Sequence, residues 1–223
     1  MLHLVLGGAR SGKSSFAESW VISEAEIKHV TPFYIATAQA FDEEMDDRIL
    51  HHQKQRANNN WQLIECPELL TELFESVNKS FDKNDVVLID CLTLWLTNQL
   101  MLGQKLVTEH IEEQTLEPCS NRNKGEGSDK NSVDFLGEYL AEQIQKLVIA
   151  LENHPATIVM VSNEIGLGVV PMGKATRLFV DHAGWMNQKL AAIAQQVTLV
   201  TAGLPLSLKN TAENSEKEEV NRG

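Results

Sequence analysis

Short apolar runs alternate with longer helix-like stretches along most of this chain. The runs have the length of buried strands and cover residues 2–6, 31–37, 61–65, 86–89, 157–162 and 197–201. The stretches between them predict helices over residues 14–26, 41–56, 67–77, 92–102, 133–152 and 173–195. Strands that alternate with helices predict an α/β fold, with a mainly parallel sheet flanked by helices.

Two segments depart from this pattern because they are polar and almost free of apolar residues. Residues 117–132 (EPCSNRNKGEGSDKNS) predict a mobile surface insert between two helices. Residues 209–223 are similar in character and predict a flexible tail. We therefore expect a single domain over residues 1–208, interrupted by the insert.

Composition excludes several classes of function. The chain has 31 acidic and 19 basic side chains and a formal net charge of −12, so we expect no nucleic-acid partner. No apolar run approaches the roughly 20 residues of a membrane span. The three cysteines, Cys66, Cys91 and Cys119, are widely spaced and odd in number, which is typical of a protein of the reducing cytoplasm.

A phosphate-binding loop follows the first predicted strand. Its residues match the pattern G-x-x-x-x-G-K-[ST] and are Gly7, Gly8, Ala9, Arg10, Ser11, Gly12, Lys13 and Ser14. Glycines let the backbone curl around one phosphate, and the following helix presents its positive end to the same anion. Lys13 can reach the β- and γ-phosphates, and Ser14 can ligate Mg²⁺. The alternative is a glycine-rich turn with a solvated lysine, but the strand and helix around the motif favour a P-loop NTPase-like fold.

Asp90 ends the predicted strand 86–89 and is a candidate second carboxylate for Mg²⁺ or its waters. The alternative is structural, because many such aspartates cap the following helix.

The polar helix predicted over residues 41–56 contains a second candidate site. Arg48, His52 and Arg56 are four residues apart and share one helix face, which suits a polyphosphate. The two cations also favour a neutral imidazole at His52, the form that attacks phosphorus. From the residues alone, a solvated helix face with two incidental histidines, His51 and His52, remains the alternative.

Together these segments resemble the bifunctional adenosylcobinamide kinase/adenosylcobinamide-phosphate guanylyltransferase family. The resemblance runs from about residue 2 to residue 205. The family-like segments are residues 7–14, 34–37, 42–45, 48–52, 61, 65–66, 90–93, 97–98, 163–171 and 181–188.

The resemblance implies two reactions. The first transfers the γ-phosphate of ATP or GTP to the aminopropanol hydroxyl of adenosylcobinamide. The second transfers GMP from GTP to that phosphate through a histidine–GMP phosphoramidate, giving adenosyl-GDP-cobinamide and pyrophosphate. The matching nucleophile is His52, and Lys13 is the matching catalytic lysine of the phosphate loop.

The same resemblance implies a guanine-nucleotide site beside the phosphate loop, and family members are typically homotrimers. Its further residues are expected to be Ala36, Thr37, Ala38, Gln53, Lys54, Gln55, Arg56, Glu65 and Asp90. The chain departs from the family at Gln53, where a basic residue is common, and at Ala57, where a proline is common.

Two other functions remain open at this point. A monofunctional P-loop kinase for another small alcohol would need the phosphate loop but no nucleophilic histidine. A non-catalytic GTP-binding switch would bind the nucleotide without transferring any part of it.

Overall fold

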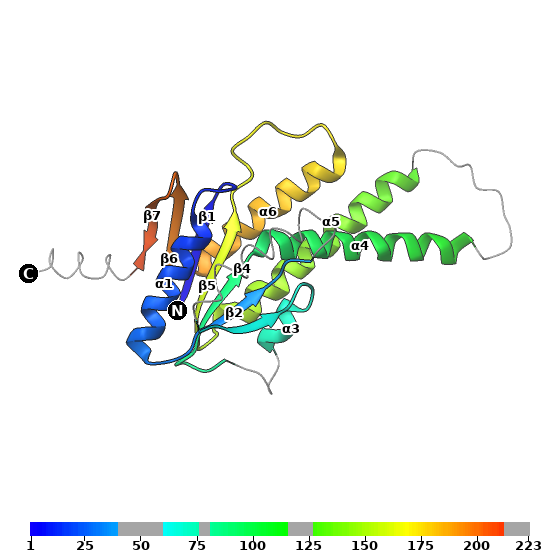
Figure 1. Ribbon diagram of the computed structural model, residues 1–223. Helices are drawn as coiled ribbons and strands as arrows, with labels where there is room; N and C mark the ends of the chain where they lie inside the picture. The colour runs from blue at the N-terminus through cyan, green and yellow to red at the C-terminus, as the bar shows by residue number, and fades with distance from the viewer. Residues whose placement is uncertain (40–59, 76–80, 116–126, 212–223) are drawn as a thin grey trace, which may run out of the picture.

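The computed structural model describes residues 1–39, 60–75, 81–115 and 127–211. Within these ranges, seven strands form one sheet in the order β3-β2-β4-β5-β1-β6-β7 (Figure 1). All neighbouring strands are parallel except β6 and β7, which are antiparallel. The strands are β1 (Leu2–Gly7), β2 (Phe33–Ala36), β3 (Gln62–Glu65), β4 (Val86–Asp90), β5 (Thr157–Asn163), β6 (Gln196–Thr201) and β7 (Leu204–Asn210). The predicted α/β class with a mainly parallel sheet is therefore confirmed.

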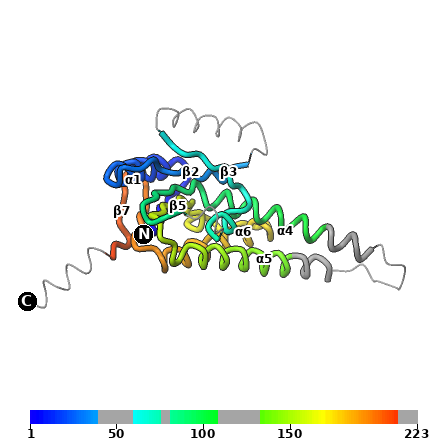
Figure 2. Tube along the Cα trace, turned by 90° about the horizontal axis from the view of Figure 1, so that it is seen from below, coloured from blue at the N-terminus to red at the C-terminus, as the bar shows by residue number. Residues whose placement is uncertain are grey.

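Helices cover both faces of this sheet. α1 lies on one face, and α4, α5 and α6 lie on the other, as the view from below shows (Figure 2). The helices are α1 (Lys13–Lys28), α3 (Leu70–Glu75), α4 (Leu92–Thr115), α5 (Gly127–Glu152) and α6 (Lys174–Ile193). No helix within the described ranges combines the length and apolar character needed to cross a membrane.

The alternation of side chains along each strand divides the core into two layers. In β4, Val86 and Leu88 pack in the cluster under α1, whereas Val87 and Ile89 pack in the larger cluster under the other helices. Successive strand residues point to opposite faces, and a parallel sheet covered on both faces needs apolar residues at both. This explains why β4 reads as an uninterrupted apolar run in the sequence.

Three predicted boundaries are corrected by the structure. α5 begins at Gly127, so residues 127–132 of the predicted polar insert are helical. α4 ends at Thr115 rather than near residue 102. The apolar pattern marks only where a helix packs against the core, and the backbone hydrogen bonds of both helices continue beyond that point.

The third correction concerns β7, which the sequence analysis did not predict. Lys209 and Asn210 belong to this strand and not to a tail. A two-residue turn at Ala202 and Gly203, both with positive φ, connects β6 to β7, as in a tight hairpin. The Lys209 amine donates hydrogen bonds to the carbonyl oxygens of Ala191 and Ala192 at the end of α6, which fixes the strand to the domain.

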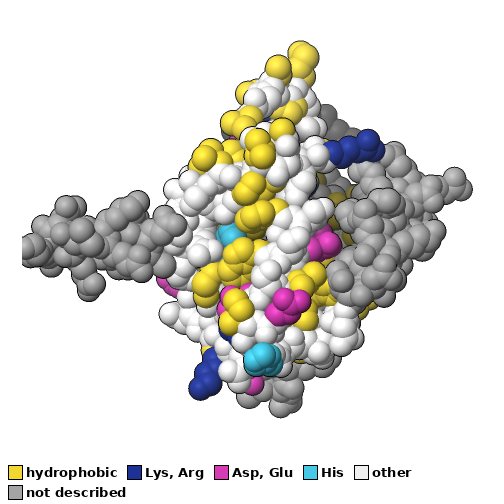
Figure 3. All heavy atoms as spheres, turned by 60° about the vertical axis from the view of Figure 1, so that its left-hand side comes forward, with side chains coloured by type: hydrophobic (Ala, Val, Ile, Leu, Met, Phe, Trp, Pro, Cys, Tyr) yellow, Lys and Arg dark blue, Asp and Glu magenta, His cyan; other side chains and the backbone are white. Residues whose placement is uncertain are grey.

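β7 forms one edge of the sheet and presents an apolar face to solvent. Leu204, Leu206 and Leu208 alternate along it and are 70, 55 and 55% exposed. With this side of the molecule turned forward, hydrophobic atoms form a band down the surface (Figure 3). These leucines therefore lie outside both core clusters.

Candidate nucleotide site

The phosphate loop connects the end of β1 to the start of α1. Gly12 immediately precedes the helix and has a φ of 93°, a left-handed conformation that favours glycine. Arg10 also has a positive φ, of 57°. The loop closes on itself through a hydrogen bond from the Ser11 amide to the Gly8 carbonyl, at 3.3 Å. The first amide groups of α1 have no carbonyl partner within the helix and are available to an anion.

Close packing at both ends holds the loop in this shape. A Cβ built on Gly7 would lie 2.5 Å from the Ser11 hydroxyl and 2.5 Å from the Val200 carbonyl oxygen, so residue 7 has no room for a side chain. On the other side, the Gly203 amide in the β6–β7 turn donates to the Ser11 carbonyl at 2.9 Å. The hairpin that the sequence analysis missed therefore supports the phosphate loop.

Lys13 lies over this loop. Its amine donates to the Gly8 carbonyl oxygen at 3.4 Å, a long and weak hydrogen bond for a charged donor. A phosphate oxygen in the cradle would compete well for this ammonium group. The side-chain oxygen of Ser11 is buried and has no hydrogen-bond partner among the described residues.

Three predicted site residues stand in one row across the neighbouring strands. Ala36 of β2 pairs with Glu65 of β3 on one side and with Asp90 of β4 on the other. Residues in register on parallel strands share a face of the sheet, and Ala36 belongs to the α1 face. One strand, β5, separates Asp90 from Gly7, so β4 and β1 are about 10 Å apart. This gap can accommodate a triphosphate that extends from the phosphate loop.

Asp90 is held by a tyrosine that sequence reasoning did not assign to the site. The buried Tyr34 hydroxyl donates to Asp90 Oδ2 at 2.7 Å. α4 begins at Leu92, so its capping position is Cys91 and not Asp90. The period of two along β2 could have identified Tyr34, since it lies two residues before Ala36 on the same face.

Thr37 fixes the backbone that follows Asp90. Its amide donates to the Asp90 carbonyl at 3.3 Å. Its hydroxyl donates to the Cys91 carbonyl at 2.7 Å and accepts from the Cys91 amide at 2.8 Å. Thr37 is fully buried, so its first role is to position this turn, whereas its neighbours Ala36 and Ala38 are partly accessible.

The two described cysteines are poor nucleophiles. Burial, together with the charge of Asp90, raises the pKa of the Cys91 thiol to about 12. Burial also raises the pKa of the Cys66 thiol. Both side chains are therefore thiols at neutral pH, and only a thiolate attacks phosphorus or disulfides efficiently.

The loop after β5 leaves the sheet beside the phosphate loop. The Glu164 amide donates to the Gly7 carbonyl at 3.1 Å, and Asn163 pairs with Gly7 in the sheet. The buried Asn163 Oδ1 has no hydrogen-bond partner among the described residues. Further along, Val169 and Met172 are each 96% exposed. This glycine-rich loop therefore starts at the same edge of the sheet as the phosphate loop.

The structure brings together only part of the predicted site. The phosphate loop, Ala36, Thr37, Ala38, Glu65 and Asp90 lie at the same edge of the sheet. The candidate nucleophile His52 and its neighbours Gln53, Lys54, Gln55 and Arg56 lie outside the described residues. Within the described ranges, no cluster of three or more histidine, cysteine, aspartate or glutamate side chains could hold a metal ion.

A strand, a glycine-rich anion cradle, a helix and a carboxylate at the end of the next strand but one define a P-loop nucleotide-binding protein. Comparison with known sequences identifies the particular family. The family described as cobinamide kinase / cobinamide phosphate guanyltransferase matches residues 3–208. The chain belongs to this family, and the resemblance noted in the sequence is confirmed.

Curated relatives match over almost their whole length. The bifunctional adenosylcobalamin biosynthesis protein CobP of Pseudomonas aeruginosa is 37% identical over 94% of this chain and 98% of its own. The bifunctional adenosylcobalamin biosynthesis protein CobU of Escherichia coli is 35% identical over 94% of this chain and 100% of its own. The protein of the same name from Salmonella typhimurium is also 35% identical.

Solved structures match more distantly. A KaiC-like protein from Pyrococcus horikoshii has 13% identity and a TM-score of 0.35, covering 89% of this chain and 69% of its own. Flagellar accessory protein FlaH from Methanocaldococcus jannaschii has 11% identity and a TM-score of 0.41, covering 95% and 79%.

Proposed function

We propose that this chain phosphorylates adenosylcobinamide and then converts the product to adenosyl-GDP-cobinamide. Membership of the family supports both reactions, and the names of the curated relatives describe bifunctional proteins of adenosylcobalamin biosynthesis. The observation that most directly supports nucleotide chemistry is the position of Asp90. One strand, β5, separates it from a phosphate loop in which Gly7 is packed tightly against Ser11 and Val200.

In the kinase step, the aminopropanol hydroxyl oxygen attacks the γ-phosphorus of ATP or GTP. A P–O bond forms, the bond to the β-phosphate oxygen breaks, the hydroxyl loses its proton, and a nucleoside diphosphate leaves. Lys13 and the amides of the phosphate loop bind the phosphate oxygens, where they stabilise the charge of the transition state. This step needs no covalent intermediate on the protein.

In the second step, a nitrogen of His52 attacks the α-phosphorus of GTP, and pyrophosphate leaves. An oxygen of adenosylcobinamide phosphate then attacks the same phosphorus, the P–N bond breaks, and the imidazole is restored. The high pKa values of Cys66 and Cys91 support a histidine over these cysteines as the nucleophile. Gln53, Lys54, Gln55 and Arg56 would line the nucleotide beside His52.

A divalent cation fits the donor set at this edge of the sheet. Ser14 offers a hydroxyl oxygen in the first turn of α1, and Asp90 offers a carboxylate. Mg²⁺ prefers such oxygen ligands, with waters and substrate phosphates completing its shell. Bound Mg²⁺ would neutralise charge on the phosphates.

Glu65 is our candidate for recognition of the guanine base. Its side chain is exposed at the end of β3, in the same row as Ala36 and Asp90. A carboxylate can accept hydrogen bonds from both the ring N–H and the exocyclic amine of guanine, whereas adenine presents a different edge. Ala36 and Ala38 have small side chains and are partly accessible at this edge of the sheet.

We also propose that the protein is a cytoplasmic homotrimer. The exposed leucines of β7, Leu204, Leu206 and Leu208, alternate along that strand and support self-association, because large apolar residues gathered on a surface often mark an interface. The buried free thiols of Cys66 and Cys91 support a reducing compartment.

Trapping the covalent intermediate tests the second reaction. Wild-type protein incubated with GTP labelled in the α-phosphate should gain the mass and label of GMP, and His52→Asn should not. The same variant should still phosphorylate cobinamide, because the kinase step does not use the imidazole. His51→Asn is the matched control and should retain the adduct.

The outcomes separate the three candidate functions. Phosphorylation of cobinamide without any adduct would identify a monofunctional kinase. GTP binding without turnover of cobinamide would identify a switch. Retention of covalent GMP by His52→Asn would reject His52 as the nucleophile.

A further inference from the structure

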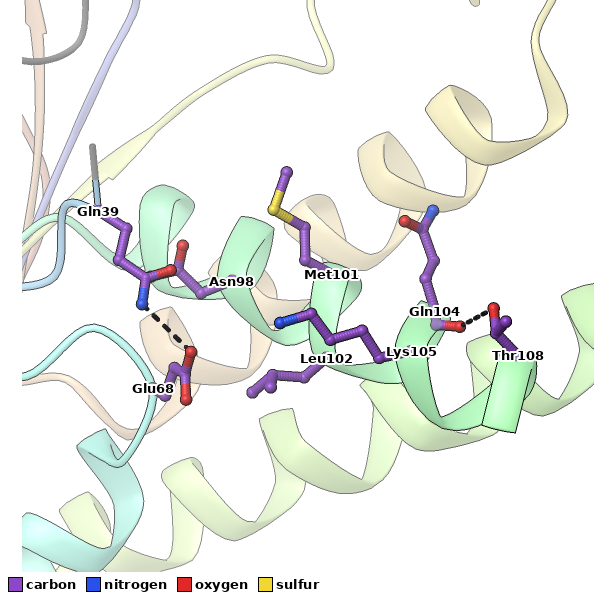
Figure 4. Close-up of a pocket in the computed structure, with 8 residues that line it drawn as sticks. All are labelled: Gln39, Glu68, Asn98, Met101, Leu102, Gln104, Lys105 and Thr108. Atoms are coloured by element: carbon purple, nitrogen blue, oxygen red, sulfur yellow. Dashed lines mark hydrogen bonds between the residues drawn. The ribbon is translucent and has the colours of Figure 1, made fainter. Parts of the chain in front are cut away.

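A cavity of about 600 Å³ lies beside α4 at the same edge of the sheet as the phosphate loop. Side chains from the segment after β2, the segment before α3 and one face of α4 surround it (Figure 4). Its size falls within the range of small-molecule sites, which is roughly 300–1,000 Å³. Its lining residues are Gln39, Glu68, Asn98, Met101, Leu102, Gln104, Lys105 and Thr108.

A short chain of hydrogen bonds connects this cavity to the nucleotide site. Asn98 Nδ2 donates to the carbonyl oxygen of Thr37 at 2.9 Å, and the Thr37 amide donates to the carbonyl oxygen of Asp90. Thr37 therefore connects Asn98, which lines the cavity, to Asp90. A molecule bound there could extend a flexible arm across Thr37 toward the phosphates.

A buried acceptor without a partner adjoins the cavity. Asn98 is only 2% exposed. Its side-chain NH₂ group donates one hydrogen bond to the carbonyl oxygen of Thr37 and one to the carbonyl oxygen of Pro67, at 2.8 Å. Its Oδ1 has no hydrogen-bond partner among the described residues. A buried oxygen without a hydrogen-bond partner is destabilising, so this position favours a ligand that brings an N–H or O–H donor.

The remaining lining residues combine hydrogen-bonding and apolar character. Gln39 Nε2 donates to Glu68 Oε1 at 3.2 Å, which leaves the other carboxylate oxygen to accept from a ligand. Lys105 extends toward the same space from α4, and Met101 and Leu102 supply apolar surface (Figure 4). Amide groups distributed around an apolar body are complementary to this mixture.

We propose that this cavity is the acceptor subsite, where it binds the carboxamide-bearing edge of the corrin ring of cobinamide. The inference rests on the proposed function for the identity of the acceptor. The ring's amide N–H groups would donate hydrogen bonds to Asn98 Oδ1 and Glu68, and its amide oxygens would accept from Lys105. The aminopropanol arm would then extend past Thr37 to the γ-phosphate near Lys13.

Filling the cavity tests this proposal. Met101→Trp places an indole in the space, and Leu106→Trp is the control, because Leu106 is a similarly exposed residue of α4 (44% against 38%) that does not line the cavity. We expect Met101→Trp to raise the KM and the Kd for cobinamide at least roughly tenfold and to leave the KM for GTP unchanged. Lys105→Glu should act in the same direction, and Leu106→Trp should match wild type.

Two further readouts keep this result separate from the proposed function. Formation of the GMP adduct needs GTP but no corrinoid, so Met101→Trp should form it at the wild-type rate. Equilibrium dialysis of cobinamide measures binding even without turnover, so weaker binding by Met101→Trp would support the subsite if the proposed reactions failed. Wild-type KM and Kd for cobinamide in a folded Met101→Trp protein would overturn the subsite, as would loss of the adduct in that variant.

Discussion

The hydroxyl of Tyr34 donates a hydrogen bond to Oδ2 of Asp90 at 2.7 Å. The two residues come from neighbouring strands, and Asp90 is in register with Ala36, two positions beyond Tyr34 on β2. A neutral donor at this distance fixes the orientation of the carboxylate. This hydrogen bond does not use the other oxygen, Asp90 Oδ1. The geometry assigns Tyr34 the role of positioning the acidic group of the proposed metal site.

Tyr34→Phe removes this hydrogen bond while keeping the aromatic ring that packs against Trp61. We expect the free energy of unfolding to fall by about 1 kcal/mol and kcat of the kinase step to fall severalfold. The concentration of Mg²⁺ needed for half-maximal rate should rise, because the carboxylate loses its fixed orientation. Urea unfolding and initial rates at varied Mg²⁺ measure the two effects.

Tyr139→Phe is the matched control for this variant. The Tyr139 hydroxyl also donates to a side chain, Gln99 Oε1, at 3.0 Å, but it belongs to α5 and lies away from Asp90. It should show a similar loss of stability with no change in Mg²⁺ dependence. An equal change in Mg²⁺ dependence for both variants would contradict a specific role for Tyr34.

Gly7 and Gly8 are adjacent in the phosphate loop but differ in the space around them. A Cβ on Gly7 would meet the Ser11 side chain and the backbone of Val200 at 2.5 Å, whereas a Cβ on Gly8 has no described neighbour within 4 Å. Overpacking of this kind typically costs about 1–3 kcal/mol. In the absence of nucleotide, Gly7→Ala should therefore lower the free energy of unfolding by this amount, and Gly8→Ala should leave it nearly unchanged.

Thermal and urea unfolding of the two variants measure the difference directly. Gly7→Ala should also lose GTP binding, because Ser11 must move and the cradle changes shape. Equal stability of the two apo proteins would show that the loop relaxes freely and is not shaped by packing against β6.

The sequence alone predicts those structural features that depend on residues close together in the chain. β4 was predicted because its apolar run is buried on both faces, and the phosphate loop was predicted because its spacing has a mechanical reason. β7 was missed although Leu204, Leu206 and Leu208 alternate. Pro205 weakens a strand prediction, yet proline is tolerated at a sheet edge. The preceding turn also places Ala202 at a φ of 51°, where Asn, Asp or Gly is usual.

The sequence patterns could not predict contacts between residues that are distant in the chain. The bond from Tyr34 to Asp90 depends on the register of β2 against β4, and the support of Ser11 by Gly203 depends on a hairpin at the other end of the chain. Neither pair has a spacing signal. The role of His52 stays a prediction, since it was made from helical spacing and family resemblance.

Lys13 should be needed for both reactions, because both use the same phosphates. We expect Lys13→Ala to lower kcat/KM of phosphorylation and the rate of GMP adduct formation by roughly 100-fold or more, the usual effect of removing a preorganised charge donor. Single-turnover rates with labelled GTP measure both. Loss of one activity with the other unchanged would contradict a shared phosphate site.

Lys28→Ala is the control for this loss of charge. Lys28 ends α1 and donates to the Thr157 hydroxyl at 2.7 Å, at the start of β5 and therefore at the opposite edge of the sheet from the phosphate loop. It should lower stability slightly and leave both rates unchanged. If Lys28→Ala lost as much activity as Lys13→Ala, the effect of the Lys13 substitution would come from the change in net charge and not from lost contact with phosphate.

His3 is an ionisable group inside the core of the α1 face. It is 2% exposed, its Nε2 lies 2.9 Å from the Thr198 hydroxyl, and its ring makes edge contacts with Phe16 and Trp20. Nδ1 has no hydrogen-bond partner among the described residues. Burial lowers the pKa of His3 from 6.5 to about 4, so the folded protein keeps this imidazole neutral at the pH of the cell.

This depressed pKa makes stability depend on pH in a defined direction. Between pH 6.5 and pH 4, the unfolded chain binds a proton at His3 and the folded protein does not, so acid favours unfolding. From the two pKa values, His3 should remove about 2 kcal/mol of stability between pH 7.5 and pH 5. Urea unfolding of wild type and His3→Gln at both pH values isolates this contribution, because the variant should lose about 2 kcal/mol less on acidification. If the free energy of unfolding depended on pH identically in the two proteins, His3 would be protonated in the folded state at pH 5. The side chains around it, including Trp20, would then have to accommodate a charged imidazole.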